Sequence, residues 1–275
     1  MFRGAINLAC HAWFGGWAFV GLVINWTGCV TIYSLCDKIE MQQGLCCKFT
    51  HWVFRWFFIT PCPWIRVSPP PYEEMVRLMN RERVFLLMNH TSFWDSILFV
   101  GIVPPNIIWR YRTLMKVKLF DMPFLGGICR MVGHFPVYFQ SKDENSFKVD
   151  KTEQAKVIEK VRAHVEANGC LAIFPEAKLN RTPEVLCTFR RGLFSLAEEH
   201  KLAVVSLTNV GNQDAWPIDA AIGGLPARIT LKLTEIAEAG HGLNAEDIRL
   251  KAEVSMQADV TSMLEERGDL KSKEN

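Results

Sequence analysis

The feature that most constrains the fold of this chain is a long stretch without charge near its N-terminus. No Asp, Glu, Lys or Arg occurs between Arg3 and Asp37, and the interval is rich in Trp, Phe, Leu, Ile and Val. A helix that crosses a bilayer needs about 20 mostly apolar residues. Because this stretch is longer, it predicts a membrane anchor that either spans the bilayer or re-enters it.

A second apolar block follows at Trp52–Ile59. It is short and aromatic, with Arg55 inside it and Arg66 just beyond it. Trp and Arg together are typical of the membrane interface rather than of the bilayer centre. We therefore expect residues 1–67 to form a membrane-anchoring helical segment.

A cleavable targeting peptide fits this N-terminus less well than an anchor does. A cleaved signal peptide begins with a basic region and a short apolar run, whereas Arg3 stands alone before a long one. A mitochondrial transit peptide is Arg-rich and amphipathic, and this segment is neither. A helical hairpin buried in a soluble fold is the remaining alternative, although the density of aromatic residues argues against it.

Composition argues against several functional classes. Across 275 residues, 31 Lys and Arg stand against 29 Asp and Glu, so the chain lacks the basic excess of a protein that binds nucleic acid. The nine Cys form no Cys-x-x-Cys pair with His partners, so we expect no metal site. A disulfide framework is unusual at this size, which favours free thiols in a reducing compartment.

The rest of the chain has the pattern of an α/β domain, which we expect over residues 68–275. Ser68–Pro71 cannot be helical and stiffens a linker at the boundary. Continuous apolar runs predict strands buried on both faces at Val84–Met88, Leu171–Phe174 and Leu202–Leu207. Helical patterns between these runs favour a mostly parallel sheet covered by helices.

Local signals predict further elements. Ile107–Arg110 and Phe135–Phe139 read as strands, and a proline confines the second to an edge or a strand start. Asp150 has capping-box spacing to an acidic residue and begins an amphipathic helix. A final amphipathic helix is expected from Asn244 onward.

A histidine and an aspartate follow the first predicted strand. His90 comes directly after it, and Asp95 lies five residues later in the first turn of the next predicted helix. A carboxylate at that position can accept a hydrogen bond from one imidazole nitrogen, which leaves the other nitrogen as a proton acceptor. The spacing alone equally fits a polar loop whose Asp stabilises the helix dipole.

A second polar motif follows another predicted strand. Phe174-Pro175-Glu176 comes at the end of that strand, and Phe189–Gly192 opens a helix further on. In open α/β sheets, ligands bind at the carboxyl ends of the strands. Two polar motifs at two such ends predict one shared pocket.

Together these motifs resemble the glycerolipid acyltransferase family, which includes the lysophosphatidic acid acyltransferases. The resemblance rests on Asn89-His90-x-Ser92-x-x-Asp95, on Phe174-Pro175-Glu176 and on the intervening Lys116–Gly126 stretch, and it covers roughly Val84–Leu233. It implies the α/β fold of that family, a mostly parallel sheet covered by helices, beside an N-terminal membrane-embedded helical segment.

The resemblance also implies roles and partners. His90 would be the general base that takes the proton of the acceptor hydroxyl, and Asp95 would orient it. The residues expected to bind the acceptor are Glu176, Lys178, Arg181, Arg190 and Arg191. The acyl donor would be acyl-coenzyme A as a co-substrate, with no bound cofactor, and the acceptor would be a membrane lipid of the endoplasmic reticulum or the mitochondrion.

The sequence departs from the family pattern around these motifs. Ala177 and Lys178 stand where the family has Gly and Thr, and Leu179 stands where it has an Arg associated with the acceptor phosphate. The Arg of the family's second motif is replaced by Gln140, with Lys142 nearby. The fourth motif lacks its Pro.

Three functions remain open. The first is an O-acyltransferase that moves a fatty acyl group from acyl-coenzyme A to a lysophospholipid hydroxyl, with lysophosphatidic acid as the favoured acceptor. The second is a phospholipid transacylase similar to tafazzin, whose third motif shares Lys178 and Asn180 with this chain. The third is a catalytically silent relative that serves as a subunit of a membrane protein complex, an idea motivated by the altered motifs.

Overall fold

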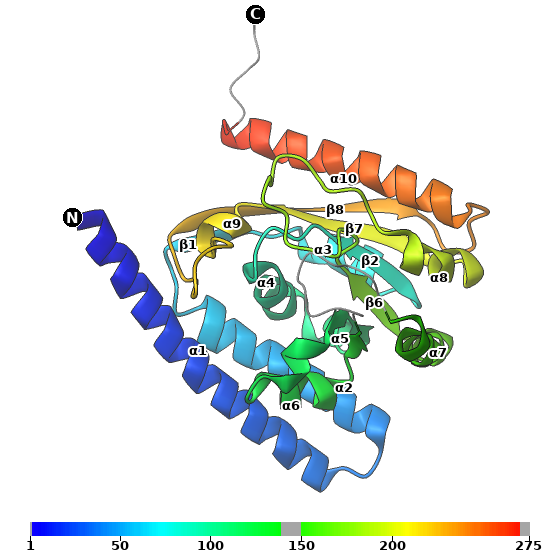
Figure 1. The fold of residues 1–275 in the computed structure, drawn as a ribbon, viewed down its shortest axis with the longest axis horizontal. Coiled ribbons are helices and arrows are strands. Elements are labelled where there is room, and N and C mark those ends of the chain that lie inside the picture. Colours follow the sequence, from blue (N-terminus) through cyan, green and yellow to red (C-terminus); the bar gives the residue numbers. More distant parts are fainter. Residues whose placement is uncertain (1, 139–149, 270–275) are drawn as a thin grey trace, which may run out of the picture.

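A computed structural model describes residues 2–138 and 150–269 of the chain. Its N-terminal part is a helical hairpin of α1 (Phe2–Leu35) and α2 (Ile39–Val53), and α2 continues into the π-helical turn η1 (Phe54–Ile59). Figure 1 shows this hairpin on one side of the sheet, with the long C-terminal helix α10 (Ala245–Arg267) on the other.

The helix α1 is a candidate membrane span by length and composition. Its 34 residues extend over about 51 Å, compared with about 30 Å for a hydrocarbon core. One face packs on α2, η1 and α6 (Leu125–Val132). Other parts of its surface are exposed and carry large apolar side chains such as Leu8 and Trp13. Phe19 and Trp26 are also exposed, and their rings contact Phe124 just before α6.

Glycine allows the two helices of the hairpin to approach closely. A Cβ at Gly28 would lie 2.1 Å from the ring of Phe49, and a Cβ at Gly21 would lie 2.8 Å from the side chain of Phe58. Only the missing side chain lets these aromatic rings pack against α1. The hairpin is therefore held by its own packing, while several large apolar side chains of α1 stay exposed in the part of the chain that the structure describes.

The main sheet has six strands in the order β1-β8-β7-β2-β6-β3. Their bounds are Ile65–Ser68 (β1), Val84–Met88 (β2), Tyr111–Arg112 (β3), Cys170–Ile173 (β6), Ala203–Val210 (β7) and Ala227–Ala237 (β8). Every neighbouring pair is parallel except β7 and β8. The predicted mostly parallel sheet is thus confirmed. The sheet begins at Ile65, so the boundary expected after residue 67 falls within β1.

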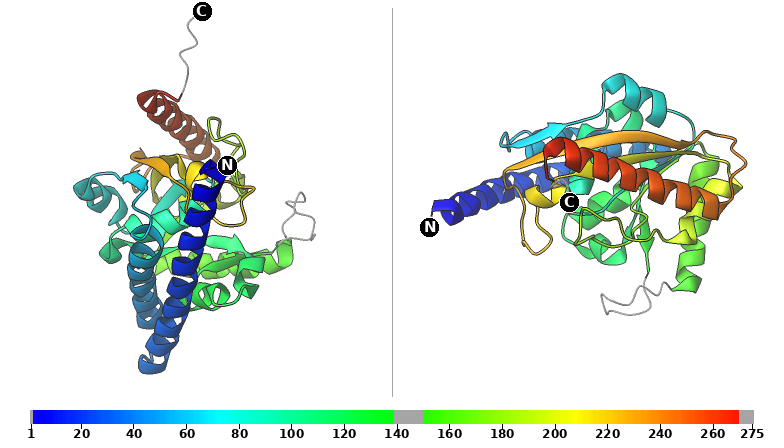
Figure 2. Two further views of the ribbon diagram at one scale, coloured as in Figure 1. Left: turned by 90° about the vertical axis from the view of Figure 1, so that its left-hand side faces the viewer. Right: turned by 90° about the horizontal axis from the view of Figure 1, so that it is seen from above.

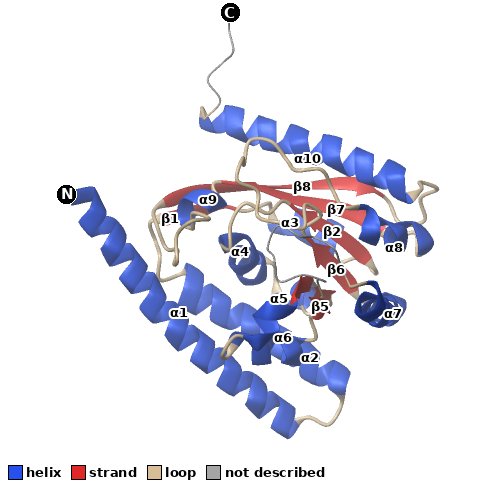
Figure 3. Cartoon of the chain, in the orientation of Figure 1, coloured by secondary structure: helices blue, strands red, loops and turns tan. Residues whose placement is uncertain are grey.

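Helices cover both faces of the sheet, as Figures 1 and 3 show. Val84 and Leu86 of β2 pack with α3 (Tyr72–Met79), α4 (Trp94–Ile102) and the N-terminal hairpin. The alternate residues Phe85 and Leu87 pack on the opposite side, with α10 and two further helices. Those two are α7 (Lys151–Glu166) and α8 (Phe194–Glu199). Because both faces are buried, β2 is apolar at every position.

Shorter elements complete the fold. Two strands, β4 (Leu114–Lys116) and β5 (Phe135–Val137), form a separate parallel pair. The remaining short elements are α5 (Pro105–Ile108), η2 (Val117–Asp121), η3 (Arg191–Leu193) and α9 (Asn212–Ala215). Figure 2 shows α10 lying across the sheet in two further views.

Several local predictions can be compared with these elements. Asp150 caps α7 by accepting hydrogen bonds from two backbone N–H groups, and Asn244 caps α10 in the same way. The strand predicted at Ile107–Arg110 is wrong, because that segment contains α5 and β3 begins only after it. The physical reason is that Pro105 occupies the first turn, where proline's fixed φ favours a helix start.

Candidate active site

Three parallel strands bring their carboxyl ends to one edge of the sheet. β2, β6 and β7 are neighbours and run in the same direction. His90 follows β2, Glu176 follows β6 and Asn212 follows β7, so the topology gathers their polar side chains at a single edge. This is the place where open α/β sheets bind ligands.

His90 and Asp95 form a hydrogen-bonded pair. The imidazole Nδ1 lies 2.9 Å from Oδ2 of Asp95. The same oxygen accepts from the backbone N–H groups of Thr91 at 2.8 Å and Ser92 at 2.9 Å. Since a carboxylate only accepts hydrogen bonds, the proton of the His–Asp bond lies on Nδ1. Nε2 then carries a lone pair that can take a proton from a substrate.

The surroundings of this pair fix its geometry. Asp95 is buried, whereas the side chain of His90 is 19 % exposed. The imidazole stacks on the ring of Phe174, with centroids 4.1 Å apart and planes inclined by 22°. Ser92 accepts a hydrogen bond of 3.1 Å from the backbone N–H of Trp94 at the start of α4. The imidazole of His90 is therefore held by several contacts and is yet partly accessible.

Glu176 joins the second motif to the first through the backbone. Its Oε1 accepts from the backbone N–H of His90 at 2.9 Å, and its Oε2 accepts from that of Cys187 at 2.8 Å. Glu176 is only 1 % exposed, and this burial raises the pKa of its carboxyl, while the two N–H groups act in the opposite direction. Both oxygens are engaged inside the protein, so the structure shows Glu176 bracing two loops.

The sequence-predicted cations divide into two groups. Lys178, Arg190 and Arg191 line a pocket of about 590 Å³ together with Glu176 and Arg249. Arg191 and Arg249 both bind the carboxylate of Glu246. Arg181 lies elsewhere, on the surface, in an ion pair of 2.9 Å with Asp219. Gln140 and Lys142 lie outside the described residues.

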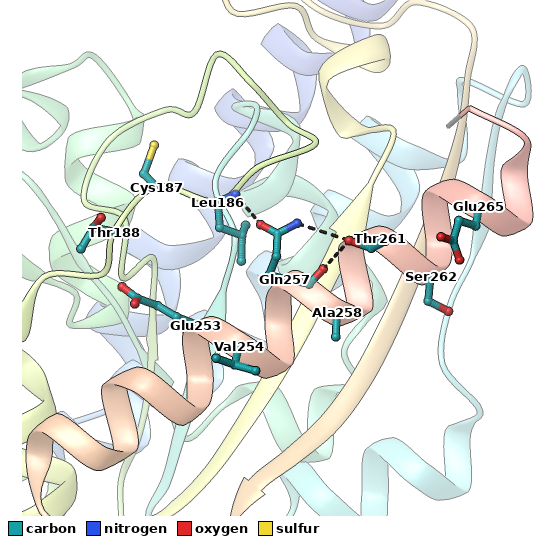
Figure 4. A pocket seen from close by; sticks show the side chains of 10 residues that line it. All are labelled: Leu186, Cys187, Thr188, Glu253, Val254, Gln257, Ala258, Thr261, Ser262 and Glu265. Atoms are coloured by element: carbon teal, nitrogen blue, oxygen red, sulfur yellow. Dashed lines mark hydrogen bonds between the residues drawn. The ribbon is translucent and has the colours of Figure 1, made fainter. Parts of the chain in front are cut away.

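A second pocket lies beside the loop that contains Cys187 and Thr188. It measures about 640 Å³ between α10 and residues 186–188, and Cys187 and Thr188 line both pockets. Figure 4 shows Gln257 of α10 at its wall, where Oε1 accepts from the backbone N–H of Leu186 at 2.9 Å. The loop that donates to Glu176 is thus fastened to the C-terminal helix.

The structure adds residues that the sequence motifs do not indicate. Asn212 donates to Asp95, and Arg249 lines the basic pocket from α10. Both lie far along the chain from the motifs that they contact. One sequence pattern could have indicated Asn212: it closely follows an apolar strand, as His90 and Glu176 each follow an apolar strand.

No metal site is evident in this region. Residues 2–138 and 150–269 contain no group of three or more His, Cys, Asp or Glu that could hold a metal ion. The groups that the structure brings to the strand ends are the hydrogen-bonded His90–Asp95 pair and a nearby cationic pocket.

The sequence profile of a protein family described as Acyltransferase matches residues 72–209, half of the chain. The chain belongs to the acyltransferase family. This confirms the resemblance drawn from the motifs. The matched segment of this chain contains His90, Asp95, Glu176, Arg190 and Arg191, whereas Asn212 and Arg249 lie beyond it.

Two known proteins are similar to this chain. A 1-acyl-sn-glycerol-3-phosphate acyltransferase of Chlamydomonas reinhardtii is 22 % identical over 175 residues, which are 61 % of this chain and 48 % of that protein. The chain thus spans about half the length of this curated relative. The crystal structure of PlsC, the 1-acyl-sn-glycerophosphate (LPA) acyltransferase of Thermotoga maritima, matches with a TM-score of 0.70 at 16 % identity, over 98 % of this chain and all of that one. This likeness shows the fold.

Proposed function

We propose that this protein is a membrane-bound O-acyltransferase that transfers a fatty acyl group from acyl-coenzyme A to the hydroxyl of a lysophospholipid, with lysophosphatidic acid as the favoured acceptor. The observation that carries the proposal is the His90–Asp95 pair at 2.9 Å, which leaves Nε2 as a proton acceptor at the edge of the sheet. The two similar proteins, a 1-acyl-sn-glycerol-3-phosphate acyltransferase and an LPA acyltransferase, agree with this acceptor.

The proposed reaction needs no bound cofactor and no covalent enzyme intermediate. Nε2 of His90 takes the proton of the acceptor hydroxyl as that oxygen attacks the thioester carbonyl carbon. The carbon–sulfur bond then breaks, and the imidazolium returns the proton to the departing thiolate. Asp95 holds the tautomer and stabilises the imidazolium while it exists. The products are the acylated lipid and free coenzyme A.

The basic pocket supports an anionic substrate. Lys178, Arg190 and Arg191 gather beside Glu176, which in turn contacts the backbone of His90. Guanidinium groups bind phosphate strongly through charge-assisted hydrogen bonds. A phosphate of the acceptor would place its hydroxyl near the base. A phosphate of coenzyme A has the same chemistry, and the two are separated by comparing the KM values of donor and acceptor.

The membrane part of the proposal rests on α1. Its uncharged length and its exposed aromatic face suit contact with lipid, which is also where a lysophospholipid resides. We propose the endoplasmic reticulum or the mitochondrion as the membrane, on the family resemblance. The intact pairing of His90 and Asp95 argues against a catalytically silent subunit.

The test is a product assay with the full chain in detergent or liposomes. Radiolabelled oleoyl-coenzyme A and lysophosphatidic acid should yield labelled phosphatidic acid together with free coenzyme A, the latter followed by mass spectrometry. His90→Ala should lose at least about 100-fold in turnover. His241→Ala is the matched control, because His241 follows β8 at the opposite edge of the sheet.

Each alternative has its own outcome in this assay. Acyl transfer from a labelled phospholipid, without release of coenzyme A, would replace the proposal with the transacylase similar to tafazzin. A folded protein that acylates lysophosphatidic acid neither from oleoyl-coenzyme A nor from a phospholipid would overturn the enzymatic proposal and favour the silent subunit.

A further inference from the structure

We infer that Asn212 is a positioning residue of the acyl-transfer site, which holds the carboxylate of Asp95 in the orientation that His90 requires. The inference rests on the proposed function and adds a third member to its His–Asp pair. Asn212 lies on α9, beyond the segment that the family profile matches.

The two oxygens of Asp95 are held from different parts of the fold. Oδ2 accepts from the imidazole of His90 and from two backbone N–H groups of its own loop. Oδ1 accepts from Nδ2 of Asn212 at 2.6 Å. The contact to Oδ1 thus comes from the end of β7, and it opposes rotation of the carboxylate about its Cβ–Cγ bond.

The turn that carries Asn212 is built for this approach. Gly211 has φ of +95°, and a Cβ there would lie 2.1 Å from the carbonyl oxygen of Arg228. Only glycine fits this conformation in that space. It lets the chain leave β7 and direct the next side chain towards Asp95, where Asn212 is 1 % exposed.

A purely structural role accounts for this arrangement less well. The ends of β2 and β7 are already tied by Asn89 and Asn209, whose side chains and backbones exchange hydrogen bonds of 2.8–2.9 Å. Moreover, Oδ1 of Asn212 is buried without a hydrogen-bond partner among the described residues. A buried acceptor without a partner destabilises the folded state, so an asparagine at position 212 lowers stability through its Oδ1. The hydrogen bond from its Nδ2 to Asp95 is the interaction that compensates for this loss.

The same contact has an electrostatic consequence. The N–H donor of Asn212 complements the negative charge of the Asp95 carboxylate, which accepts the Nδ1 proton of His90. A carboxylate at position 212 would reverse this effect, because two carboxylates at hydrogen-bond distance cannot both ionise and must share a proton. The charged groups on α9 and on the strand β8 packed against it are Asp214, Arg228, Lys232 and Glu235; His90 faces Asp95, and Arg267 of α10 bonds to Asp214.

The experiment compares three full-length variants, Asn212→Leu, Asn212→Asp and the control Asn244→Asp. Asn244→Asp makes the same chemical change at the N-cap of α10, where Asp caps equally well. By analogy with residues that orient metal-binding histidines, Asn212→Leu should lower kcat by about 10- to 100-fold with both KM values unchanged. At acidic pH a shared proton bridges the two carboxylates, so the kcat of Asn212→Asp should stay close to that of wild type at the same pH. As the pH rises and this proton is lost, the kcat of the variant should fall, which adds an alkaline limb to its pH profile. Wild type and Asn244→Asp should lack that limb.

A second readout separates this inference from the proposed function. The downfield Nδ1–H resonance of His90, identified by its loss in His90→Ala, should shift in Asn212→Leu and stay in place in Asn244→Asp. A wild-type protein without acyl transfer would overturn the proposed function and leave this resonance to test the positioning of His90. The inference is overturned by a folded Asn212→Leu protein with wild-type kcat, by an Asn212→Asp pH profile that matches wild type, or by an unshifted resonance.

Discussion

The backbone N–H of His90 lies 2.9 Å from Oε1 of Glu176, so the acidic residue of one motif holds the main chain of the other. The second oxygen of Glu176 holds Cys187 in the loop that leads to the basic pocket. A single buried carboxylate therefore sets the position of the base relative to the pocket.

Glu176→Gln should disturb this brace. A glutamine side chain offers one acceptor oxygen, so one of the two backbone N–H groups would face an amide NH₂ and lose its bond. We expect a loss of about 1–3 kcal/mol in the free energy of unfolding, together with a fall in kcat. Urea unfolding and initial rates measure the two effects. Glu184→Gln, an exposed change in the same loop, is the control, and equal behaviour of the two variants would refute the brace.

The basic pocket predicts a selective effect on substrate affinity. Arg190→Ala and Arg191→Ala should raise the KM for lysophosphatidic acid by about tenfold, because a charge-assisted bond to phosphate is lost, while kcat changes little. The increase should be smaller for lysophosphatidylcholine. Arg181→Ala serves as the control, since Arg181 pairs with Asp219 on the surface. An acceptor KM that stays flat, or a donor KM that rises instead, would remove both arginines from the acceptor site.

Ala177 adopts a backbone conformation that favours glycine. Its φ is +56°, at the position where the family usually has Gly. The left-handed region costs an L-residue about 1–2 kcal/mol, so Ala177→Gly should leave the protein at least as stable as wild type. Ala177→Val should destabilise it further. Ala163→Gly is the matched control, because Ala163 lies within α7, where glycine should cost about 0.5–1 kcal/mol. Thermal unfolding of all three variants decides the point, and parallel losses in both glycine variants would contradict it.

Two histidines should make stability fall in mild acid. Burial, with the charge of Arg112 as a lesser cause, lowers the pKa of His134 to about 3 and that of His164 to about 4. Below about pH 6.5 these two histidines bind protons in the unfolded chain but stay neutral in the folded protein. Stability should therefore decrease as pH drops from about 6.5 towards 4.5, by up to about 1.4 kcal/mol per pH unit for each histidine.

The variant His134→Asn tests this sign. An asparagine oxygen can accept the hydrogen bond that the backbone N–H of Thr113 gives to Nδ1 of His134 at 3.2 Å, but it does not titrate. Unfolding midpoints at pH 7.5 and pH 5 should differ less in this variant than in wild type. An equal difference in both proteins would show that His134 is not a source of the acid sensitivity.

The outer face of α1 should bind lipid. The full chain should pellet with membranes and resist carbonate extraction. Phe19, which is 61 % exposed, is the natural position to probe, because a charged residue at the centre of a spanning helix costs about 3 kcal/mol on insertion. Phe19→Glu should release protein into the carbonate supernatant. Val185→Glu, at an exposed apolar position of the loop beside α10, should not, and a wild-type chain that is freely soluble would contradict the assignment.

Local sequence information was sufficient for much of this fold. The apolar run at Val84–Met88 is the strand β2, because a strand buried on both faces leaves no position for a polar residue. Asp150 and Asn244 mark helix starts by satisfying backbone N–H groups within three residues. The spacing of His90 and Asp95 placed one within reach of the other, because a strand end and the following helical turn fix that distance.

The tertiary structure decided how the site is completed. The bond from His90 to Glu176 joins residues 86 positions apart, and the bond from Asn212 to Asp95 joins residues 117 positions apart. Both depend on β2 lying between β6 and β7, an order that no local pattern encodes. The tertiary structure also places Arg181 beside Asp219 and away from the pocket that Arg190 and Arg191 line, although all three follow one strand in sequence. Residue types and short spacings are properties of the chain itself, whereas the partners of a side chain are set by which strand ends the sheet brings together.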